Sequence, residues 1–495
     1  MVENYAININ FDLFFRIIIM IFKNISNILF DSLPEFIRTF REIGLECLQK
    51  AVDAVKPQRL IYESVKVNDQ SLFIQEDIFH LDDFDHIYVI GGGKATAEMA
   101  FTLELILQES GYNISQGFIN IPEGLKVNGQ KNDSKIQLNF ASHPVPNEIG
   151  VYGVKKMVEI IETSKSTDLI ICLISGGGSA LLPYPKASIT LEDLQIVNSL
   201  LLESGATIQE FNAIRKHLSR IKGGNLAKIV YETSKATLLT LIISDVIGDP
   251  LDVIASGPTV PDTTRFHDAI EIFKNYNLWE SIPESVKLKL NEGKANKSLE
   301  NPDKDNPCFS KVHNYLIGSI KNAEKKVDLY LKSKGFHTQY YSDEITGEAR
   351  DYGRELYSDI REHVIEMKKK NIGKLALIGS GELTVTIQGK GIGGRNQEML
   401  LSFLETISRN PYDFTFLIIG ANLDGIEGNS SAMGALVDNF VLAKMRKLNI
   451  DPDEYLRNNN SNSFFKQIGT ELYTGYTGCN VNDLLIILLE IEVLL

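Results

Sequence analysis

The chain has 495 residues, of which 43% are hydrophobic and 23% are charged, a composition typical of a globular protein with a sizeable core. Its 64 acidic and 50 basic residues leave a net charge of −14, which disfavours a nucleic acid as the main partner. The cysteines lack CxxC spacing and nearby His pairs. This argues against a disulfide framework or a zinc site and makes the cytoplasm the default compartment.

The first thirty residues leave two interpretations open. The run 11–22 is apolar, but it is short for a membrane span and Arg16 interrupts it, so we expect no stable membrane span. The scarcity of Arg and Ser fits a transit peptide poorly. Residues 1–32 are expected to form an N-terminal extension. It is either a targeting or membrane-associated segment, for example one directed to the mitochondrion, or a packed or frayed appendage.

From Leu33 onward, short apolar runs alternate with amphipathic stretches, as in a parallel sheet whose two faces are covered by helices. The runs expected as buried strands are 87–90, 169–174, 238–243, 315–317, 375–378, 383–387, 414–419 and 484–489. The segments expected as helices include 94–107, 150–163, 191–202, 320–334, 349–370 and 396–407. This alternation predicts an α/β fold with doubly wound sheets.

One segment is a candidate linker. Residues 291–311 are polar, contain two prolines and lack apolar periodicity. We therefore expect two domains, one over 33–290 and the other over 312–495.

Two of the expected strands end in three glycines. The first run, Gly91, Gly92 and Gly93, precedes Lys94 at the start of a helix, and the second lies in the loop Ser175, Gly176, Gly177, Gly178, Ser179. Glycine lets the backbone approach an anion, a helix N-terminus offers free N–H donors, and Lys94 adds a positive charge. Neither run has Walker A spacing. The pair predicts a site for a polyanion such as a nucleotide, and the alternative is a steric need for tight turns and close helix packing.

A basic segment follows. Five of the eight residues 215–222 are basic or His, namely Arg215, Lys216, His217, Arg220 and Lys222. Such a patch suits a carboxylate or a phosphate, whereas the plainer interpretation is a solvated helix face.

The strand expected over 238–243 leads to Asp245, at the end of the strand where α/β enzymes bind ligands. A carboxylate there is suited to holding magnesium or to accepting a hydroxyl proton. Later, residues 389–394 match GxGxxG, but the acidic residue expected about twenty positions on is absent, so we reject a dinucleotide site. Arg395 then opens a helix and suits contact with a phosphoryl group.

Seven motifs in the sequence are typical of one protein family. In chain order they are VIGGGKA, SHPVPNE, LISGGGSALLPYP, RKHLSRIKGGNLA, SDVIGDPLDVIASGPTVPD, GKGIGGRNQE and TGYTGCNVNDL. Together, over residues 33–488, they closely resemble the glycerate 2-kinases named after a MOFRL C-terminal domain. The resemblance implies a larger Rossmann-like N-terminal domain, a smaller α/β C-terminal domain and an active site in the cleft between them. It also implies transfer of the γ-phosphoryl group of ATP, with Mg²⁺, to the 2-hydroxyl of D-glycerate.

Carried onto this chain residue by residue, the resemblance implies that Lys94, Asp245 and Arg395 are the catalytic residues. Lys94 and Arg395 would clamp the transferring phosphoryl group, whose transition state spreads negative charge over its oxygens. Asp245 would bind magnesium or position the 2-hydroxyl. The glycine loops would hold phosphates, and Arg215 with Lys216 would bind the glycerate carboxylate.

Six further residues are as well explained by turns and caps as by function: His143, Glu382, Glu398, Asp424, Asn480 and Asp483. The segment 420–430 departs from the family pattern, with Leu423 in place of a Thr and Asn429 in place of a Pro. If this loop contacts nucleotide, we expect nucleotide affinity or choice to differ.

Two alternative functions are kept. Members of the family are also labelled hydroxypyruvate reductases, but the missing acidic partner of the GxGxxG argues against an oxidoreductase. A non-catalytic nucleotide-binding protein would need only an intact site, and the presence of all three implied catalytic residues argues against it. Homo-oligomerisation is left open.

Overall fold

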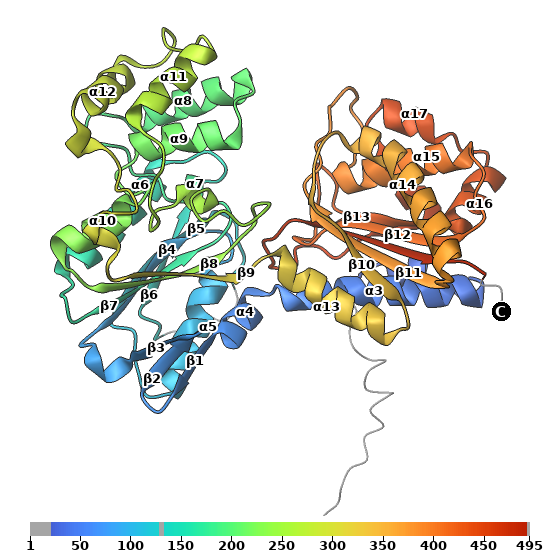
Figure 1. Cartoon of the computed structure of the whole chain (residues 1–495), viewed down its shortest axis with the longest axis horizontal. Helices are drawn as coiled ribbons and strands as arrows, with labels where there is room; N and C mark the ends of the chain where they lie inside the picture. The colour runs from blue at the N-terminus through green and yellow to red at the C-terminus, as the bar shows by residue number, and fades with distance from the viewer. Residues whose placement is uncertain (1–20, 128–132, 493–495) are drawn as a thin grey trace, which may run out of the picture. The chain divides into compact units, whose positions relative to one another are not determined.

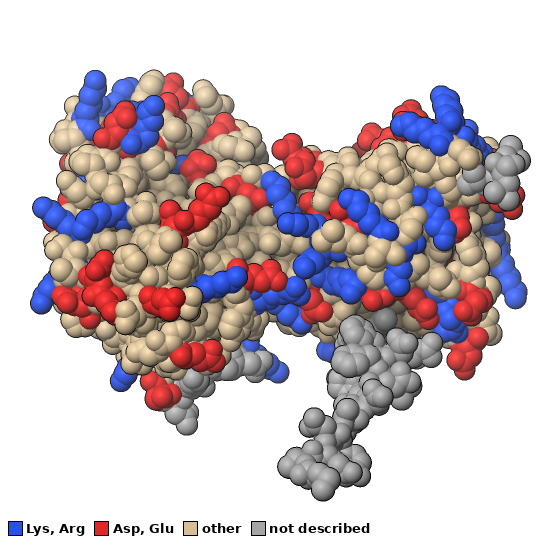
Figure 2. Space-filling view, turned by 60° about the horizontal axis from the view of Figure 1, so that its bottom comes forward, with Lys and Arg blue, Asp and Glu red and all other residues tan. Residues whose placement is uncertain are grey.

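The computed structural model describes residues 21–127 and 133–492, which divide into two compact units. The large unit comprises Asp53–Lys325 with Gly478–Asn482, and the small unit comprises the chain up to Val52, Lys326–Thr477 and the chain from Asp483 onward. Among the described residues, no helix is both long and apolar enough to cross a membrane. Over the face shown in Figure 2, Lys and Arg side chains are interspersed with Asp and Glu.

A six-stranded parallel sheet organises the large unit, and it confirms the expected doubly wound fold. Its strands, in spatial order, are β6 (Ile136–Ala141), β5 (Gln116–Pro122), β4 (Ile87–Gly92), β7 (Leu169–Ile174), β8 (Thr237–Ile243) and β9 (Val312–Gly318). The order along the sheet reverses between β4 and β7. In open α/β sheets such a switch point is where ligands bind.

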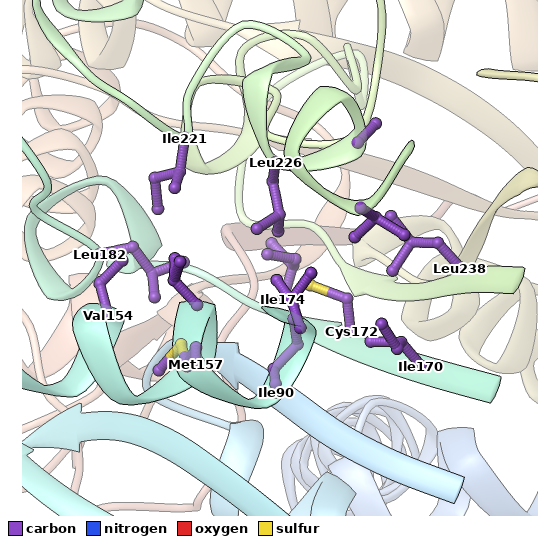
Figure 3. Close-up of a cluster of buried hydrophobic side chains, with 14 of the residues drawn as sticks. Ile90, Val154, Met157, Ile170, Cys172, Ile174, Leu182, Ile221, Leu226 and Leu238 are labelled. Carbon is purple, nitrogen blue, oxygen red and sulfur yellow. The ribbon is translucent and has the colours of Figure 1, made fainter. Parts of the chain in front are cut away.

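Helices cover both faces of this sheet (Figure 1): α6 (Glu148–Thr163) and α10 (Asn225–Thr233) lie on one, and α4 (Pro57–Ser64) and α5 (Thr96–Glu109) on the other. On the first face, Ile90 and Ile174 of the strands meet Met157 of α6 and Leu226 of α10 in a buried cluster (Figure 3). Burial of this apolar surface is the main force that fixes the strand ends, and with them the loops that follow.

Two smaller substructures complete the large unit. An antiparallel three-stranded sheet joins β1 (Val65–Asn68), β2 (Ser71–Ile74) and β3 (Asp77–His80). Four helices with a core of their own are α8 (Leu191–Ser204), α9 (Ile208–Leu218), α11 (Phe266–Asn275) and α12 (Glu284–Ala295). The basic segment therefore begins on α9, whose apolar side is buried against other helices instead of being solvated all round.

The sheet of the small unit is mixed, which corrects the expectation of parallel sheets throughout. Its strands, in order, are β10 (His337–Ile345), β11 (Lys374–Gly381), β15 (Asp483–Glu490), β12 (Thr415–Asn422), β13 (Gly434–Asp438) and β14 (Glu471–Leu472). Only β10 and β11 pair in parallel, because β15, from the end of the chain, inserts antiparallel between β11 and β12.

Helices cover the sheet of the small unit as well. The paired helices α14 (Ala349–Lys370) and α15 (Arg395–Ser408) pack on one another, and α15 packs on β12 and β13. Gly44 of α3 (Glu35–Ala54) lies against Leu417 and Ile419 of β12, where a larger side chain would clash.

Two further expectations differ from the structure. The run 383–387 is not a strand. Thr384 makes one bridge to Glu348, and the side chain of Glu348 accepts the N–H of Thr386. The apolar alternation here therefore belongs to a loop.

The segment 291–311, expected as a linker, lies inside the large unit, because β9 directly after it pairs with β8. The change of unit falls instead within α13 (Ile320–Ser333).

Residues 1–20 lie outside the described part, but residues 21–32 of the expected N-terminal extension are packed on the small unit. Phe22 and Ile28 are buried, and Asn24 exchanges hydrogen bonds with Glu471 and Tyr473. The guanidinium of Arg41 on α3 donates to the carbonyl of Ile28 and to the carboxylate of Asp438, at the start of α16 (Asn439–Lys447). This part of the segment is therefore an integral part of the fold.

Removing one partner of this buried ion pair predicts a large loss of stability. Arg41 and Asp438 are each 1% exposed and lie 2.7 Å apart. Arg41→Leu leaves a buried carboxylate without its cation, so we expect the free energy of unfolding to fall by about 3 kcal/mol, measured by urea denaturation. The matched control is Arg59→Leu, which removes an exposed pair with Glu63 at the same 2.7 Å distance and should cost under about 1 kcal/mol. Equal losses would contradict this account.

Candidate active site

The two triple-glycine loops lie side by side at the switch point of the large sheet. β4 and β7 are neighbours in parallel register, with Gly92 opposite Ile174, so their C-terminal ends lie at the same edge. The loops are also joined directly. The N–H of Lys94 donates to the carbonyl of Gly176 over 2.9 Å, and the N–H of Ala95 donates to Oγ of Ser175 over 3.0 Å.

Steric limits explain several of the glycines. A Cβ on Gly91 or Gly93 would lie about 2 Å from Leu173 O or Ser175 Oγ, respectively, and both residues have positive φ. A Cβ on Gly176 would lie 1.8 Å from the carboxylate of Asp245. The alternative interpretation, a steric need for glycine, therefore holds at these positions.

The second loop also offers donors that the protein does not use. Among the described residues, the backbone N–H groups of Gly176 and Gly177 have no hydrogen-bond partner, and Gly177 has a φ of +79°. Consecutive amides in such a turn form a concave cradle for an anion. Close packing and anion binding are thus combined in one loop.

A carboxylate and an amide lie over this loop. Asp245 follows β8, the strand next to β7, and is half-buried. Asn480, from the segment 478–482 of the large unit, is buried and its Nδ2 donates to Oδ2 of Asp245 over 3.3 Å. The structure thus brings Asn480, expected only as a secondary candidate, to the residue assigned to magnesium or the hydroxyl.

Lys94 and His143 lie next to Gly177 of the second loop. The position that a Cβ would take on Gly177 is 3.0 Å from Nε2 of His143 and 3.4 Å from Cγ of Lys94. Burial and the positive charge of Lys94 lower the pKa of His143, so the imidazole is neutral at pH 7. Lys94 therefore provides the positive charge at this position.

The residues named for the substrate carboxylate separate in the structure. Lys216 is 2% exposed and its ammonium lies 3.1 Å from Asp252 and 3.3 Å from Asp262, so its charge is balanced inside the fold. Arg215 has no carboxylate partner within the described part of the chain, and it stacks on the ring of Phe211 at 4.1 Å. Only Arg215 of this pair is available to an anionic ligand.

In the small unit, Arg395 lies at the first residue of α15 and is held by two carboxylates. Nε and Nη2 donate to the two oxygens of Asp483 over 2.5 and 2.8 Å, and Nη1 donates to Glu382 over 2.6 Å. Burial alone would lower the pKa of Arg395, but the bonds and charges of Asp483 and Glu382 raise it. Three of the five guanidinium N–H groups donate hydrogen bonds, and Asp483, which is 8% exposed, fixes the orientation of the guanidinium.

The start of α15 is capped by a third carboxylate. Glu427 accepts the backbone N–H groups of Asn396 and Gln397 over 2.9 and 3.0 Å. Burial and the charge of Asp483 raise the pKa of Glu427 to about 7. This cap, which sequence reasoning missed, positions the helix end that carries Arg395.

The GxGxxG loop before α15 does not present its amides to a ligand. Asn459 Oδ1 accepts the N–H groups of Gln388 and Gly389, and the neighbouring Asn458 and Asn460 accept those of Lys390 and Ile392. A Cβ on Gly389 would lie 2.4 Å from Asn458, so the glycines permit close packing of this polar run. The geometry agrees with the rejection of a dinucleotide site.

The remaining candidates have mixed positions. Glu398 is buried and accepts hydrogen bonds from Arg350, over 2.5 Å, and from Asn459. Burial raises the pKa of Glu398. These contacts give Glu398 a structural role. Asp424 lies in a turn, where its N–H donates to Asn422 and its carbonyl accepts from Thr477. Glu398, but not Asp424, lines a cavity of about 470 Å³ together with Leu383, Val385, Ile387, Gly389, Gly393 and Arg395, among others.

A conservative change tests whether the fork of Arg395 matters. Arg395→Lys keeps the charge but loses the planar bidentate geometry toward Asp483. If Arg395 contacts the transferring group, kcat should fall about a hundredfold while the melting temperature changes little. The matched control is Arg350→Lys, whose guanidinium is also paired with a buried carboxylate, that of Glu398. An unchanged kcat would remove Arg395 from the mechanism.

Comparisons with known proteins agree with this division of the chain. Residues 44–291 match a family described as a domain of unknown function (DUF4147), and residues 375–483 match the MOFRL family. A glycerate 2-kinase of Pyrococcus horikoshii is 39% identical over 90% of this chain and 96% of its own length. A D-glycerate 2-kinase of Thermotoga maritima is 34% identical over 90% of this chain and 98% of its own length.

The fold agrees as well. The crystal structure of a glycerate kinase from Thermotoga maritima matches with a TM-score of 0.76 at 33% identity, over 91% of this chain and 99% of that chain. A protein of Agrobacterium vitis named a putative hydroxypyruvate reductase is 36% identical over 81% of this chain and 98% of its own length. With both family models matched in order and identities of 34–39% over nine-tenths of its length, the chain belongs to the glycerate kinase family with a MOFRL domain.

Proposed function

We propose that this protein transfers the γ-phosphoryl group of ATP to the 2-hydroxyl of D-glycerate, giving 2-phosphoglycerate and ADP. One observation carries the proposal most directly. At one edge of the large sheet, two unused loop amides, the ammonium-bearing side chain of Lys94 and the carboxylate of Asp245 converge within one unit. Donors for phosphate oxygens and an acceptor for a hydroxyl proton are the parts that phosphoryl transfer needs.

The proposed roles follow from these positions. The N–H groups of Gly176 and Gly177 bind phosphate oxygens of ATP, as consecutive free amides do in other anion sites. Lys94 neutralises charge that develops on the transferring phosphoryl group. The resemblance assigns Arg395 to the same charge, and Asp483 holds its guanidinium fork in place, with two N–H groups left unbonded among the described residues.

Mg²⁺ fits the donor set around Asp245. Magnesium prefers oxygen ligands and is usually bound by one or two carboxylates together with substrate phosphates and water. Asp245 supplies a carboxylate at the loop that is proposed to bind phosphates, and the Asn480 side chain beside it supplies an amide oxygen. When bound, the ion would neutralise phosphate charge. The proposed role of Asp245 is either to ligate the magnesium ion or to orient the 2-hydroxyl of glycerate and accept the proton of that hydroxyl.

We also propose that the protein acts in the cytoplasm. None of the four cysteines, all of which lie in the described residues, forms a disulfide, which is typical of a reducing compartment. The role of residues 1–20 in targeting stays a prediction, and deletion of residues 1–20 from a fluorescent fusion tests it.

The direct test is an ADP-release assay with purified protein, magnesium and ATP. D-glycerate should support turnover, and L-glycerate and hydroxypyruvate should not. The competing function, named for the Agrobacterium vitis relative, is tested in parallel by oxidation of NADH with hydroxypyruvate. NADH oxidation without ADP release would overturn the proposal in favour of a reductase.

A further inference from the structure

One buried lysine of the large unit, Lys222, has no carboxylate partner among the residues that the structure describes. Lys222 is 5% exposed, and its ammonium donates to the carbonyl of Ser179, in the second glycine loop, over 3.0 Å. Burial and the positive charge of Arg215 lower the pKa of Lys222 to about 7. Two cations therefore lie near each other under the loop that the proposed function assigns to phosphates.

The contrast with Lys216 is informative, since it lies six residues away and is equally buried. Lys216 has two carboxylates within 3.3 Å, whereas among the described residues neither Lys222 nor Arg215 has an Asp or Glu oxygen within 4.0 Å. An isolated cation is costly to bury, because it loses its hydration without gaining a partner. Such an arrangement is a candidate functional site when it lies beside a ligand-binding loop.

A second, independent feature lies at the same place. Asn212, one turn before Arg215 on α9, is 2% exposed, and its Nδ2 has no hydrogen-bond partner in the described ranges 21–127 and 133–492. Its Oδ1 accepts from Ser256, whose Oγ is 2.9 Å from Oγ of Ser179. Ala255 and Ser256 both have positive φ, of +50° and +61°, which is costly for residues with a Cβ and tends to occur at ligand sites.

The fold holds these groups in place. Ile221, the neighbour of Lys222, points into the buried cluster of the large unit together with Leu182 and Leu226 (Figure 3). The N–H of Lys222 is bonded to Oγ of Ser219, and Arg215 is fixed by Asn198 over 3.2 Å. Preorganised, desolvated donors of this kind are what an anionic group of a small substrate requires.

We propose that Lys222 and Arg215, with the free amide of Asn212, form the subsite for the carboxylate of the acceptor substrate. This inference rests on the proposed function. It differs from the prediction made from the sequence in that Lys222, and not Lys216, is the partner of Arg215, because the charge of Lys216 is already balanced. A carboxylate is favoured over a phosphate because the phosphates already have the unused amides of Gly176 and Gly177 and the charge of Lys94. The guanidinium fork of Arg215 matches a carboxylate.

Proton uptake follows from this assignment. Arg215 on α9 is the charged group that acts on Lys222, and Ser179 on α7 (Gly178–Leu181) is its acceptor. An ammonium with a pKa of about 7 is mostly neutral at pH 8, and a bound carboxylate favours its charged form. Binding of D-glycerate at pH 8 should therefore take up protons, and KM for D-glycerate should rise about tenfold per pH unit above pH 7.

The test compares Lys222→Met, Lys222→Arg and Arg215→Gln with the wild type. Loss of a charged hydrogen bond should raise KM for D-glycerate about 10- to 100-fold in Lys222→Met, with KM for ATP unchanged. Lys222→Arg should recover part of the affinity. Proton uptake, measured by calorimetry in two buffers of different ionisation enthalpy, should vanish in Lys222→Met. The control is Lys186→Met, another buried lysine of the large unit, whose ammonium lies over the ring of Phe266 at 4.7 Å, and it should keep the wild-type KM.

Other results would overturn the inference. An increase in KM for ATP instead of D-glycerate would make this a phosphate site. An unchanged KM, with only a lower melting temperature, would mean that Lys222 merely supports the Ser179 loop. If Lys222→Met does not fold, Arg215→Gln decides by the same readouts. If the wild type fails to phosphorylate D-glycerate, the proposed function fails, and calorimetric binding of glycolate to wild type and variants still decides the subsite.

Discussion

Replacing Lys94 with Met is expected to lower kcat about a thousandfold with little change in stability. The side chain lies beside Gly177, and its backbone N–H is bonded to Gly176, so it is held next to the two unused amides. Methionine keeps the length and the apolar stem but removes a positive charge that is proposed to act on the transferring phosphoryl group. Losing one preorganised donor to a developing charge costs 10²- to 10³-fold in comparable sites, and a full charge costs more.

The measurement is steady-state ADP release, with circular dichroism and a thermal melt to confirm folding. Lys66→Met, on the exposed side of β1, is the matched control and should match the wild type. Binding of ATP without turnover should survive in Lys94→Met, because the loop amides remain. A variant that keeps more than about a tenth of the wild-type kcat would contradict the assigned role of Lys94.

Asp245→Asn is expected to lower kcat by about three orders of magnitude. The amide is nearly isosteric and can still bond to Asn480, so the loops should stay in place. It can neither accept a proton nor supply a negative charge to magnesium, and general base catalysis alone is worth 10²- to 10⁴-fold. The control is Asp249→Asn in the same loop, whose carboxylate lies 3.5 Å from Lys321 and whose positive φ asparagine tolerates.

Magnesium titration separates the two proposed roles of Asp245. If the carboxylate ligates the ion, the variant should need more magnesium, and high concentrations should restore part of kcat. If it is the base, the loss should be independent of magnesium, and the acidic limb of the pH–rate profile should disappear. Full activity at all magnesium concentrations would exclude Asp245 from both roles.

Much of the large unit was predictable because its signals are local. The apolar runs before Gly91 and before Ser175 predict buried parallel strands, and the carboxyl ends of parallel strands in doubly wound sheets lie at a common edge. That logic places the two loops and Asp245 together before any coordinates are known. The structure agrees, with β4, β7 and β8 adjacent in that order.

What escaped prediction depends on non-local pairing and on burial. The sequence of residues 484–489 does not predict that this strand inserts between β11 and β12, because the pairing of antiparallel strands depends on packing with distant parts of the chain. Similarly, Lys216 and Lys222 look alike in a basic run. Only the folded chain shows that Lys216 has two carboxylate partners, whereas Lys222 has none among the described residues.

The measurement that tests the central claim most directly is ³¹P NMR of the reaction of purified protein with magnesium, ATP and D-glycerate. Phosphorylation at the 2-hydroxyl places phosphorus three bonds from a single proton, so the new monoester resonance should be a doublet, growing as ATP is converted to ADP. Phosphorylation at the 3-hydroxyl would give a triplet from the two methylene protons. A triplet would contradict the proposed position of transfer, and loss of ATP only to inorganic phosphate would contradict a glycerate kinase altogether.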